Sequence, residues 1–208
     1  MKPDPGRENW DDSYRQKGRL YGGATRILPD FPQGARVLEL GCGDGKTLSA
    51  LVPQAGDVTA IDFSPHAVRI ARSAPHGAGR IGFAIADARE VPFHDQVFDT
   101  VTAIHLLGHS TSEGRSKIVS EILRVTRKGG YVFFADFSTA DFRYGNGTET
   151  EPGSFVRGNG ILTHYFTEPE VASLFSGFTQ ESLHREEWML RVRGKEFLRS
   201  ELIGLFRK

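Results

Sequence analysis

Three alternating glycines and a later acidic residue form the most informative pattern in the sequence. Gly41, Gly43 and Gly45 lie directly between a predicted buried strand and a predicted helix. Glycine lets the backbone turn sharply there and approach a ligand closely, and the following helix directs free N–H groups and a partial positive charge at that ligand. Asp62 ends the next predicted strand, roughly 20 residues on, where a carboxylate can accept hydrogen bonds from ribose hydroxyls. The pattern predicts a nucleoside-binding site.

A dinucleotide is not the expected ligand of this loop. The pyrophosphate fingerprint is Gly-x-Gly-x-x-Gly, and its third glycine would fall at Lys46. Glu39, just before the loop, is a poor neighbour for a pyrophosphate and a reasonable one for a cationic ligand. A nicotinamide-dependent enzyme therefore stays open only as a disfavoured alternative.

Strands and helices that alternate along the chain would position these residues. Strands are predicted over residues 36–41, 58–61, 81–86, 97–104 and 131–137, and helices over 46–53, 64–73 and 113–127. Ser64 and Pro65 supply a cap and a first-turn proline for the second helix, and Gly129-Gly130 is expected to end the third. This rhythm implies right-handed crossovers and a mostly parallel, doubly wound sheet.

Both ends of the chain depart from that rhythm. Trp10, Tyr14 and Tyr21 predict a short helix followed by a loop. Residues 138–166 are rich in Gly, Asn, Thr and aromatic residues and have no clear period, so an irregular segment is expected. A helix should begin near residues 167–170, and two antiparallel strands are predicted over 178–188 and 197–207.

Four segments, taken in order, resemble the motifs of class I S-adenosylmethionine-dependent methyltransferases of the small single-domain kind. They are Val37-Leu-Glu-Leu-Gly-Cys-Gly-Asp-Gly45 followed by the acid Asp62, then Ala86-Asp87-Ala88, Phe98-Asp99-Thr-Val101 and Leu123-Arg-Val-Thr-Arg-Lys-Gly-Gly130. They cover about residues 36–137. The resemblance implies a Rossmann-like, doubly wound, mostly parallel seven-stranded α/β sheet with an antiparallel C-terminal strand and helices on both faces. It also implies S-adenosylmethionine as the methyl donor and S-adenosylhomocysteine as the product.

The same resemblance assigns donor-binding roles. The methionine part and the loop backbone would be surrounded by Glu39, Gly41, Cys42 and Gly43, with Tyr14 and Tyr21 closing over them. Asp62 would bind both ribose hydroxyls, with Phe63 beside the adenine. Asp87 would bind the adenine amino group, Ala88 would supply a backbone donor, and His105 and Leu106 would lie under the sulfonium. The alternatives are plainer: a simple turn for the glycines, a helix cap for Asp62, a loop residue for Asp87 and a purely backbone contribution from Cys42.

Methyl transfer from a sulfonium mainly requires alignment of the acceptor, and a general base helps when the acceptor carries a proton. The candidate catalytic residues are His105, His109, His164 and Tyr165, although a lone histidine is more often a packing or surface residue. No metal site is expected, because His105 and His109 are four apart without a glutamate partner.

A single methyltransferase domain over residues 1–208 is expected. Residues 1–30 would form a lid, 36–137 the donor-binding core, 138–166 an acceptor-side insertion and 167–208 a closing helix and strands. Arg143 and Arg157 in the insertion could bind a carboxylate or phosphate of the acceptor.

Composition narrows the partners. Lys plus Arg equals Asp plus Glu at 26 each, which argues against wrapping a phosphate backbone. Nucleic acid is therefore not indicated but not excluded. A single cysteine, a polar N-terminus without a signal peptide and no apolar run of ~20 residues predict a cytoplasmic protein without membrane contact. A monomer or homodimer is expected.

The favoured function is methyl transfer to an N, O or S atom of an unidentified small molecule. The alternatives are a protein or RNA methyltransferase, motivated by the Arg-rich stretch 185–199, and a noncatalytic module that binds the donor.

Overall fold

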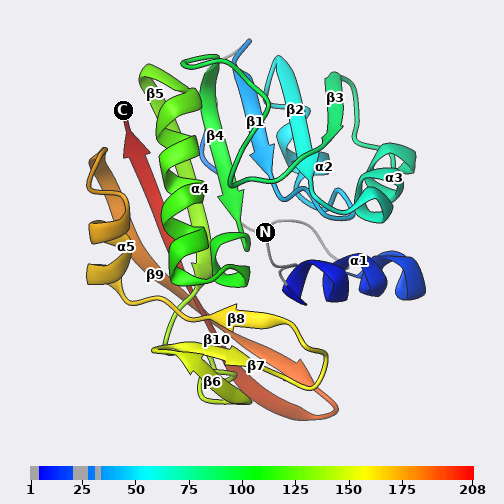
Figure 1. Ribbon diagram of the computed structural model, residues 1–208, viewed down its shortest axis with the longest axis vertical. Coiled ribbons are helices and arrows are strands. Elements are labelled where there is room, and N and C mark those ends of the chain that lie inside the picture. Colours follow the sequence, from blue (N-terminus) through cyan, green and yellow to red (C-terminus); the bar gives the residue numbers. More distant parts are fainter. Residues whose placement is uncertain (1–4, 21–27, 31–33) are drawn as a thin grey trace.

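The computed structural model describes residues 5–20, 28–30 and 34–208, so the expected role of Tyr21 lies outside the described residues. A seven-stranded sheet with strand order β3-β2-β1-β4-β5-β10-β9 forms the body of the protein (Figure 1). Its first part contains α1 (Pro5–Lys17), β1 (Arg36–Leu40), α2 (Leu48–Leu51), β2 (Asp57–Asp62), α3 (Pro65–Ser73), β3 (Arg80–Ile85), β4 (Phe98–Ile104), the 3₁₀ helix η1 (Leu107–His109), α4 (Ser112–Val125) and β5 (Thr126–Phe137). The second part contains β6 (Thr148–Glu151), β7 (Ser154–Val156), β8 (Leu162–His164), α5 (Glu168–Leu174), β9 (Thr179–Val192) and β10 (Lys195–Arg207).

The sheet is mostly parallel. β1 pairs in parallel with β2 and β4, and β5 continues the parallel series beyond β4. β10 runs antiparallel to β5, and β9 folds back antiparallel to β10. The predicted seven-stranded, mostly parallel sheet with an antiparallel C-terminal strand is confirmed.

Helices cover both faces of the sheet because successive side chains of a strand point to opposite faces. Leu38 and Leu40 of β1 pack in one core cluster with Ile118 and Ile122 of α4. Val37 packs on the other face, in a cluster with α2 and α3 residues. Full burial of each large aliphatic side chain contributes roughly 1.5–3 kcal/mol. These two apolar layers hold the carboxyl ends of the strands in place.

The ends of two predicted helices were wrong. The helix predicted over residues 46–53 is only α2, Leu48–Leu51. The helix α4 ends at Val125, before Gly129-Gly130, because Thr126 already pairs with Phe98 as the first residue of β5. The ladder resumes with Thr100 opposite Tyr131, so residues 127–130 bulge out and Gly129 takes a left-handed φ of +73°. The glycine pair therefore shapes a strand, not a helix end.

Residues 138–166 are not irregular, as the sequence suggested, but contain a small antiparallel sheet, β6-β7-β8. Its strands are only three or four residues long, too short for a period to be visible in the sequence. A bridge between Ser138 and Phe166 brings both ends of the segment together at the end of β5. The segment is thus an excursion from the carboxyl edge of the main sheet (Figure 1).

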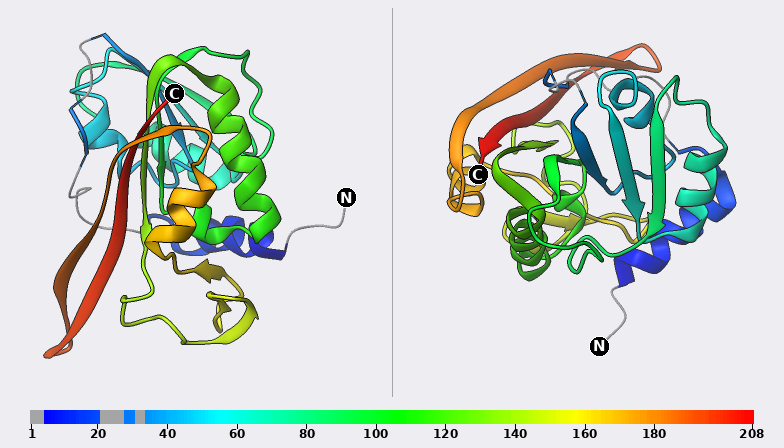
Figure 2. Two further views of the ribbon diagram at one scale, coloured as in Figure 1. Left: turned by 90° about the vertical axis from the view of Figure 1, so that its left-hand side faces the viewer. Right: turned by 90° about the horizontal axis from the view of Figure 1, so that it is seen from above.

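The last two strands form a hairpin that is longer than predicted. It extends well past the rest of the sheet (Figure 2). Arg193 and Gly194, both with positive φ, make its turn. None of the described helices has the length and apolar character needed to cross a membrane.

Candidate active site

A cavity of about 420 Å³ lies at the carboxyl ends of the parallel strands. Such a position is where open α/β sheets bind ligands. Its wall combines α1, the glycine loop, the ends of β2 and β4, the 138–166 segment and the β9-β10 hairpin. The wall includes Trp10, Tyr14, Gly41, Cys42, Gly43, Asp62, Phe63, His105, Leu106, His109, Phe137, Arg143, Arg157, Glu186, Glu187, Trp188, Arg199, Glu201 and Ile203.

The glycine loop can only be built with glycine. Gly41 and Gly43 have φ values of +71° and +53°. A Cβ atom added to Gly43 would lie 2.6 Å from the Tyr14 hydroxyl, and one on Gly41 would lie 2.8 Å from Leu106 Cδ1. The loop is therefore packed directly beneath Tyr14 and Leu106, which places both residues over the backbone that was expected to cradle the ligand.

Asp62 links the loop to the next helix. One carboxylate oxygen accepts a hydrogen bond from Gly43 N at 2.9 Å, and the other accepts from Ser64 N at 2.9 Å. Ser64 in turn caps α3 by accepting from Ala67 N. The carboxylate is almost fully buried yet forms part of the cavity wall, with Phe63 beside it.

Glu39 and Cys42 supply charge and packing at the base of the loop. Glu39 is 1% exposed and shares a hydrogen bond with the Thr102 hydroxyl, but it is not part of the cavity wall. Burial raises the pKa of Glu39 to about 8. Burial also raises the pKa of the Cys42 thiol far above its usual range, so this thiol is not a nucleophile at neutral pH.

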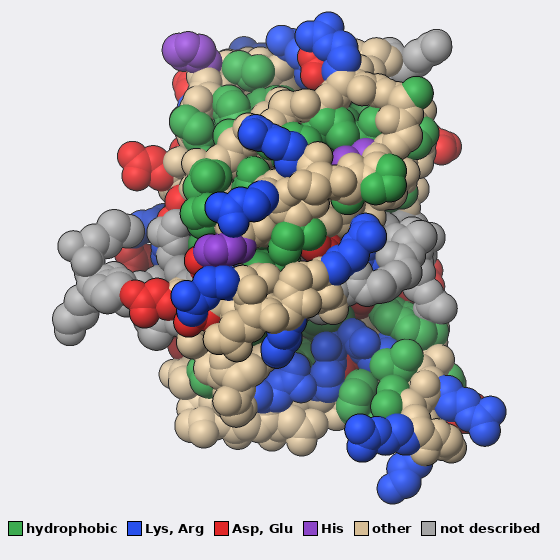
Figure 3. Space-filling view, turned by 90° about the vertical axis from the view of Figure 1, so that its right-hand side faces the viewer, with side chains coloured by type: hydrophobic (Ala, Val, Ile, Leu, Met, Phe, Trp, Pro, Cys, Tyr) green, Lys and Arg blue, Asp and Glu red, His purple; other side chains and the backbone are tan. Residues whose placement is uncertain are grey.

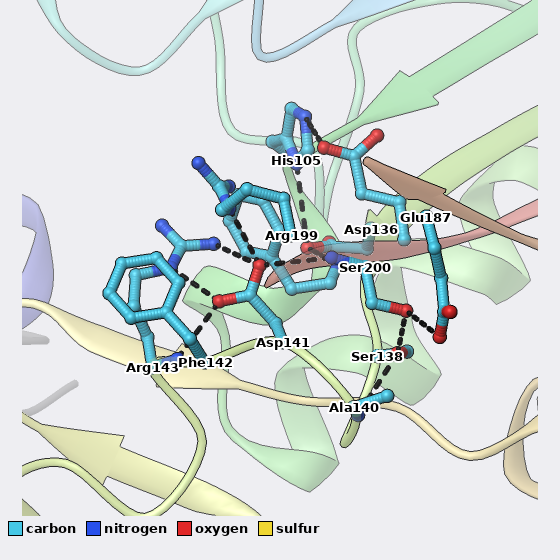
Figure 4. A network of polar contacts seen from close by, with 12 residues as sticks. His105, Asp136, Ser138, Ala140, Asp141, Phe142, Arg143, Glu187, Arg199 and Ser200 are labelled. Atoms are coloured by element: carbon cyan, nitrogen blue, oxygen red, sulfur yellow. Dashed lines mark hydrogen bonds and ion pairs between the residues drawn. The ribbon is translucent and has the colours of Figure 1, made fainter. Parts of the chain in front are cut away.

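His105 is a half-buried cation. Its Nε2 lies 3.3 Å from Glu201 Oε1, and its Nδ1 lies 3.8 Å from Asp136 Oδ1, too far for a hydrogen bond (Figure 4). Burial by itself lowers the pKa of His105, but the two carboxylates outweigh it and raise the pKa to about 9. The residue also has a φ of +50° and stacks on Phe137 at 4.4 Å. At neutral pH this ring is already protonated and does not act as a base.

His109 has the opposite character. Its Nδ1 lies 2.7 Å from the Leu162 carbonyl oxygen, which can only accept a hydrogen bond, so Nδ1 carries the proton. Burial lowers the pKa of His109, which favours the neutral ring. Trp10 meets the ring edge-on at 4.8 Å. The Nε2 lone pair of this ring has no hydrogen-bond partner within the described part of the chain and belongs to a side chain of the cavity wall.

Three comparisons with known proteins agree with this geometry. Residues 37–130 match the family model of a methyltransferase domain. A tRNA N(3)-methylcytidine methyltransferase of Drosophila melanogaster is 28% identical over 96% of this chain and 70% of its own length. A ubiquinone/menaquinone biosynthesis C-methyltransferase of Geotalea daltonii is 33% identical over 75% of this chain and 63% of its own. The crystal structure of an S-adenosylmethionine-dependent methyltransferase from Methanosarcina mazei has a TM-score of 0.74 at 25% identity, over 88% of this chain and 99% of its own.

The chain belongs to the class I S-adenosylmethionine-dependent methyltransferases. The predicted family, and with it the donor S-adenosylmethionine, is confirmed. The chain spans between 42% and 70% of the length of the first curated relatives that it matches. Those relatives bear names for both small-molecule and tRNA methylation, so they do not select an acceptor.

Besides Glu39, four residues expected at the site of this methyltransferase lie outside the cavity wall. Asp87 forms a salt bridge of 2.8 Å with Arg89, and Ala88 is buried in the core beside it. His164 lies between Ser154 and Glu170, with Nδ1 2.8 Å from the serine hydroxyl and Nε2 2.8 Å from the carboxylate. These distances suit a nucleophilic relay, but Ser154 is fully buried and is not part of the cavity wall.

Tyr165 is the fourth of these residues. Its side chain is buried, and its hydroxyl has no hydrogen-bond partner among the residues that the structure describes. Burial raises the pKa of Tyr165, and the nearby charges of Arg143 and Arg157 oppose that rise.

The C-terminal hairpin supplies site residues that were not expected from the sequence. Arg199, Glu201 and Ile203 of β10 line the cavity, as does Trp188 of β9. The three β10 residues are spaced two apart, as side chains on one face of a strand are. That spacing was visible in the sequence, but nothing local showed which face would meet the site.

Proposed function

We propose that this methyltransferase transfers the methyl group of S-adenosylmethionine to an N, O or S atom of a small molecule bound in the 420 Å³ cavity. One observation carries the proposal: a single cavity wall contains the glycine loop with Asp62 and a neutral histidine, His109, whose Nε2 is unpaired within the described residues. The donor supplies a methyl group that is already activated on a sulfonium, so the chain mainly has to align the acceptor.

The donor half of the cavity suits a nucleoside with a cationic tail. The left-handed glycines let the backbone approach a ligand, and a Cβ on Gly41 or Gly43 would collide with Leu106 or Tyr14. Asp62 would accept hydrogen bonds from ribose hydroxyls, with Phe63 beside the base. Tyr14 covers the loop from the other side. Glu39 lies behind the loop, where its ionised form would stabilise a positive charge through space.

The adenine contact is the least direct of the donor assignments. An adenine amino group would have to share the Asp87 carboxylate with Arg89, which holds it at 2.8 Å. We retain Asp87 and Ala88 as the proposed adenine contacts on the family resemblance. We do not retain His164 and Tyr165 as catalytic residues, because neither belongs to the cavity wall.

His109 is proposed to manage the acceptor proton. Nε2 accepts the proton from the acceptor atom as the new bond to the methyl carbon forms and the methyl–sulfur bond breaks. The Leu162 carbonyl holds the ring in the required tautomer through Nδ1–H. The imidazolium that results releases its proton to water. His105 stays protonated between Asp136 and Glu201 and fixes the end of β4.

A small acceptor is favoured over a macromolecule because α1 and the β9-β10 hairpin both contribute to the cavity wall. A tRNA acceptor is the second candidate, since the Drosophila melanogaster relative that aligns with 96% of this chain is named for it. We also propose a single methyltransferase domain, acting in the cytoplasm as a monomer or homodimer. The proposed location rests on one cysteine and its burial, which leaves no disulfide to form within the chain.

Calorimetric titration with S-adenosylhomocysteine and with NAD tests the donor assignment. Binding of the former is expected, with a weaker or absent response to NAD; the reverse result would overturn the donor site. Incubation with labelled S-adenosylmethionine and fractionated cell extract tests the transfer. Label in the small-molecule fraction supports the proposal. Label confined to RNA or protein would instead indicate a methyltransferase that acts on a macromolecule. Absence of label in every fraction supports a noncatalytic module.

A further inference from the structure

Three arginines gather on the acceptor side of the cavity. Arg143 and Arg157 come from the 138–166 segment and Arg199 from β10, and all three belong to the cavity wall. Figure 3 shows Lys and Arg side chains recessed in a hollow in the lower half of one face of the molecule. Arginines in a cavity wall, unlike those on an open surface, are partly shielded from water, which strengthens their interaction with a ligand charge.

Two of the three guanidinium groups, those of Arg143 and Arg199, share one carboxylate. Asp141 is fully buried and lies 2.7 Å from Nε of Arg143 and 2.7 Å from Nε of Arg199 (Figure 4). The side chain of Arg157 makes no hydrogen bond or ion pair with any residue in the described ranges. Three positive charges therefore meet one negative charge, which leaves an excess of two.

Three acidic side chains of the hairpin also belong to this wall. Glu201 is paired with His105 at 3.3 Å. Glu186 lies 3.5 Å from His184, and Glu187 lies 3.9 Å from Arg185. Within the described residues, none of these three carboxylates forms an ion pair with Arg143, Arg157 or Arg199.

Aromatic rings complete the arrangement. The guanidinium carbon of Arg143 lies 3.8 Å from the centre of the Phe137 ring, and that of Arg199 lies 5.4 Å from the Trp188 ring. Such stacking holds a planar guanidinium in one orientation. The unpaired guanidinium of Arg157 in the same wall indicates a ligand that accepts hydrogen bonds.

We propose that the methyl acceptor carries an anionic group, bound by Arg157 together with Arg143 and Arg199, while the atom to be methylated lies toward His109. The identification of this ligand as the acceptor rests on the proposed function above. A guanidinium pairs with carboxylate and phosphate in the same bidentate geometry, so the shared chemistry is a planar or tetrahedral oxyanion. The aromatic rings that flank the arginines suit an acceptor with a flat body next to that group.

Calorimetric titrations with three matched probes test this anion site. Benzoate, phenyl phosphate and uncharged benzamide have similar size, and each is titrated into protein saturated with S-adenosylhomocysteine. At least one anion is expected to bind about tenfold or more tightly than benzamide, as an ionic hydrogen bond to a shielded guanidinium implies. The anion that binds more tightly shows whether the anionic group of the acceptor is a carboxylate or a phosphate.

Two variants test whether the preference for an anion comes from Arg157. Arg157→Gln is expected to remove the preference for the anion, whereas Arg191→Gln, an exposed arginine of the hairpin outside the cavity wall, retains it. Equal binding of benzamide and both anions, or an unchanged preference in Arg157→Gln, overturns the inference. Label transfer to RNA alone in the extract experiment also overturns it. The same titrations without S-adenosylhomocysteine test the anion site by itself, so a failure of donor binding is not confused with a failure of this inference.

Discussion

Replacement of Glu39 by glutamine should change how the stability of the protein depends on pH. Burial raises the pKa of Glu39 from its ordinary 4.5 to about 8, so between these values the folded state holds a proton that the unfolded chain has lost. Burial of Glu39 therefore destabilises the fold least below pH 4.5, where the side chain is protonated in both states. The free energy of unfolding then falls as the pH rises toward 8. At 1.36 kcal/mol for each pH unit, the whole interval corresponds to roughly 5 kcal/mol.

Urea unfolding at about pH 5 and about pH 8.5, without donor, measures this difference. The wild type should lose several kcal/mol more than Glu39→Gln, which keeps the shape of the side chain but cannot ionise. His105, whose pKa is raised from 6.5 to about 9, stabilises the fold below pH 6.5 and loses that effect as the pH rises through 9, but equally in both proteins. Glu196→Gln, an exposed residue at the hairpin end, serves as the control. Parallel pH curves for wild type and Glu39→Gln would refute the reasoning, because they would mean that Glu39 is ionised in the folded apoprotein.

Three further substitutions test the donor loop and the proton acceptor. Asp62→Asn should weaken S-adenosylhomocysteine binding by about 10- to 100-fold in calorimetry, since a charged acceptor for the ribose is lost; unchanged affinity would show that the ribose lies elsewhere. Gly43→Ala should abolish binding, and Tyr14→Ala should not rescue it, because the φ of +53° at Gly43 strains alanine even after the contact with Tyr14 is removed. His109→Gln should lower the maximal methylation rate by about 10²- to 10⁴-fold while donor affinity stays the same. In the wild type the rate should rise with pH through the lowered pKa of His109, below 6.5, and then level off, and a His109→Gln profile with the same rise would exclude this residue as the base.

The elements of the proposed donor half could be predicted from the sequence because each of them is local. The glycine loop, the acid that ends β2 and the loop after β4 each lie at the end of a strand that is recognisable from its own buried residues. The parallel order of those strands then brings all three to one edge of the sheet. No long-range contact had to be known beyond the general rule for alternating strands and helices.

The acceptor half could not be predicted in the same way. Arg199 and Glu201 reach the site only because β10 pairs antiparallel with β5, with Glu201 opposite Phe137. The register of that pairing decides which alternate side chains face the cavity, and a shift by one residue would turn Arg199 away. The charges of the two histidines were also hidden, since they depend on Asp136, Glu201 and the Leu162 carbonyl.

This division explains why the comparisons identify the donor and leave the acceptor open. The matched methyltransferase domain covers residues 37–130, which contain the glycine loop, Asp62 and both cavity histidines. Trp10, Trp188 and the three arginines all lie outside it. Relatives named for quinone biosynthesis and for tRNA can therefore share the first set of residues with this chain without sharing the second.

The helix α1 joins the two halves. Asn9 donates a hydrogen bond to the Gly160 carbonyl on the acceptor side at 2.9 Å. Asp11 accepts one from the Ser64 hydroxyl on the donor side at 2.5 Å, and the same helix places Tyr14 over the glycine loop. A donor that orders Tyr14 would thus also order the contact at Gly160, next to the arginines. The acceptor wall is therefore coupled to the donor loop through one helix that lies outside the matched domain, and the specificity of this enzyme has to be sought in α1, the 138–166 segment and the hairpin together.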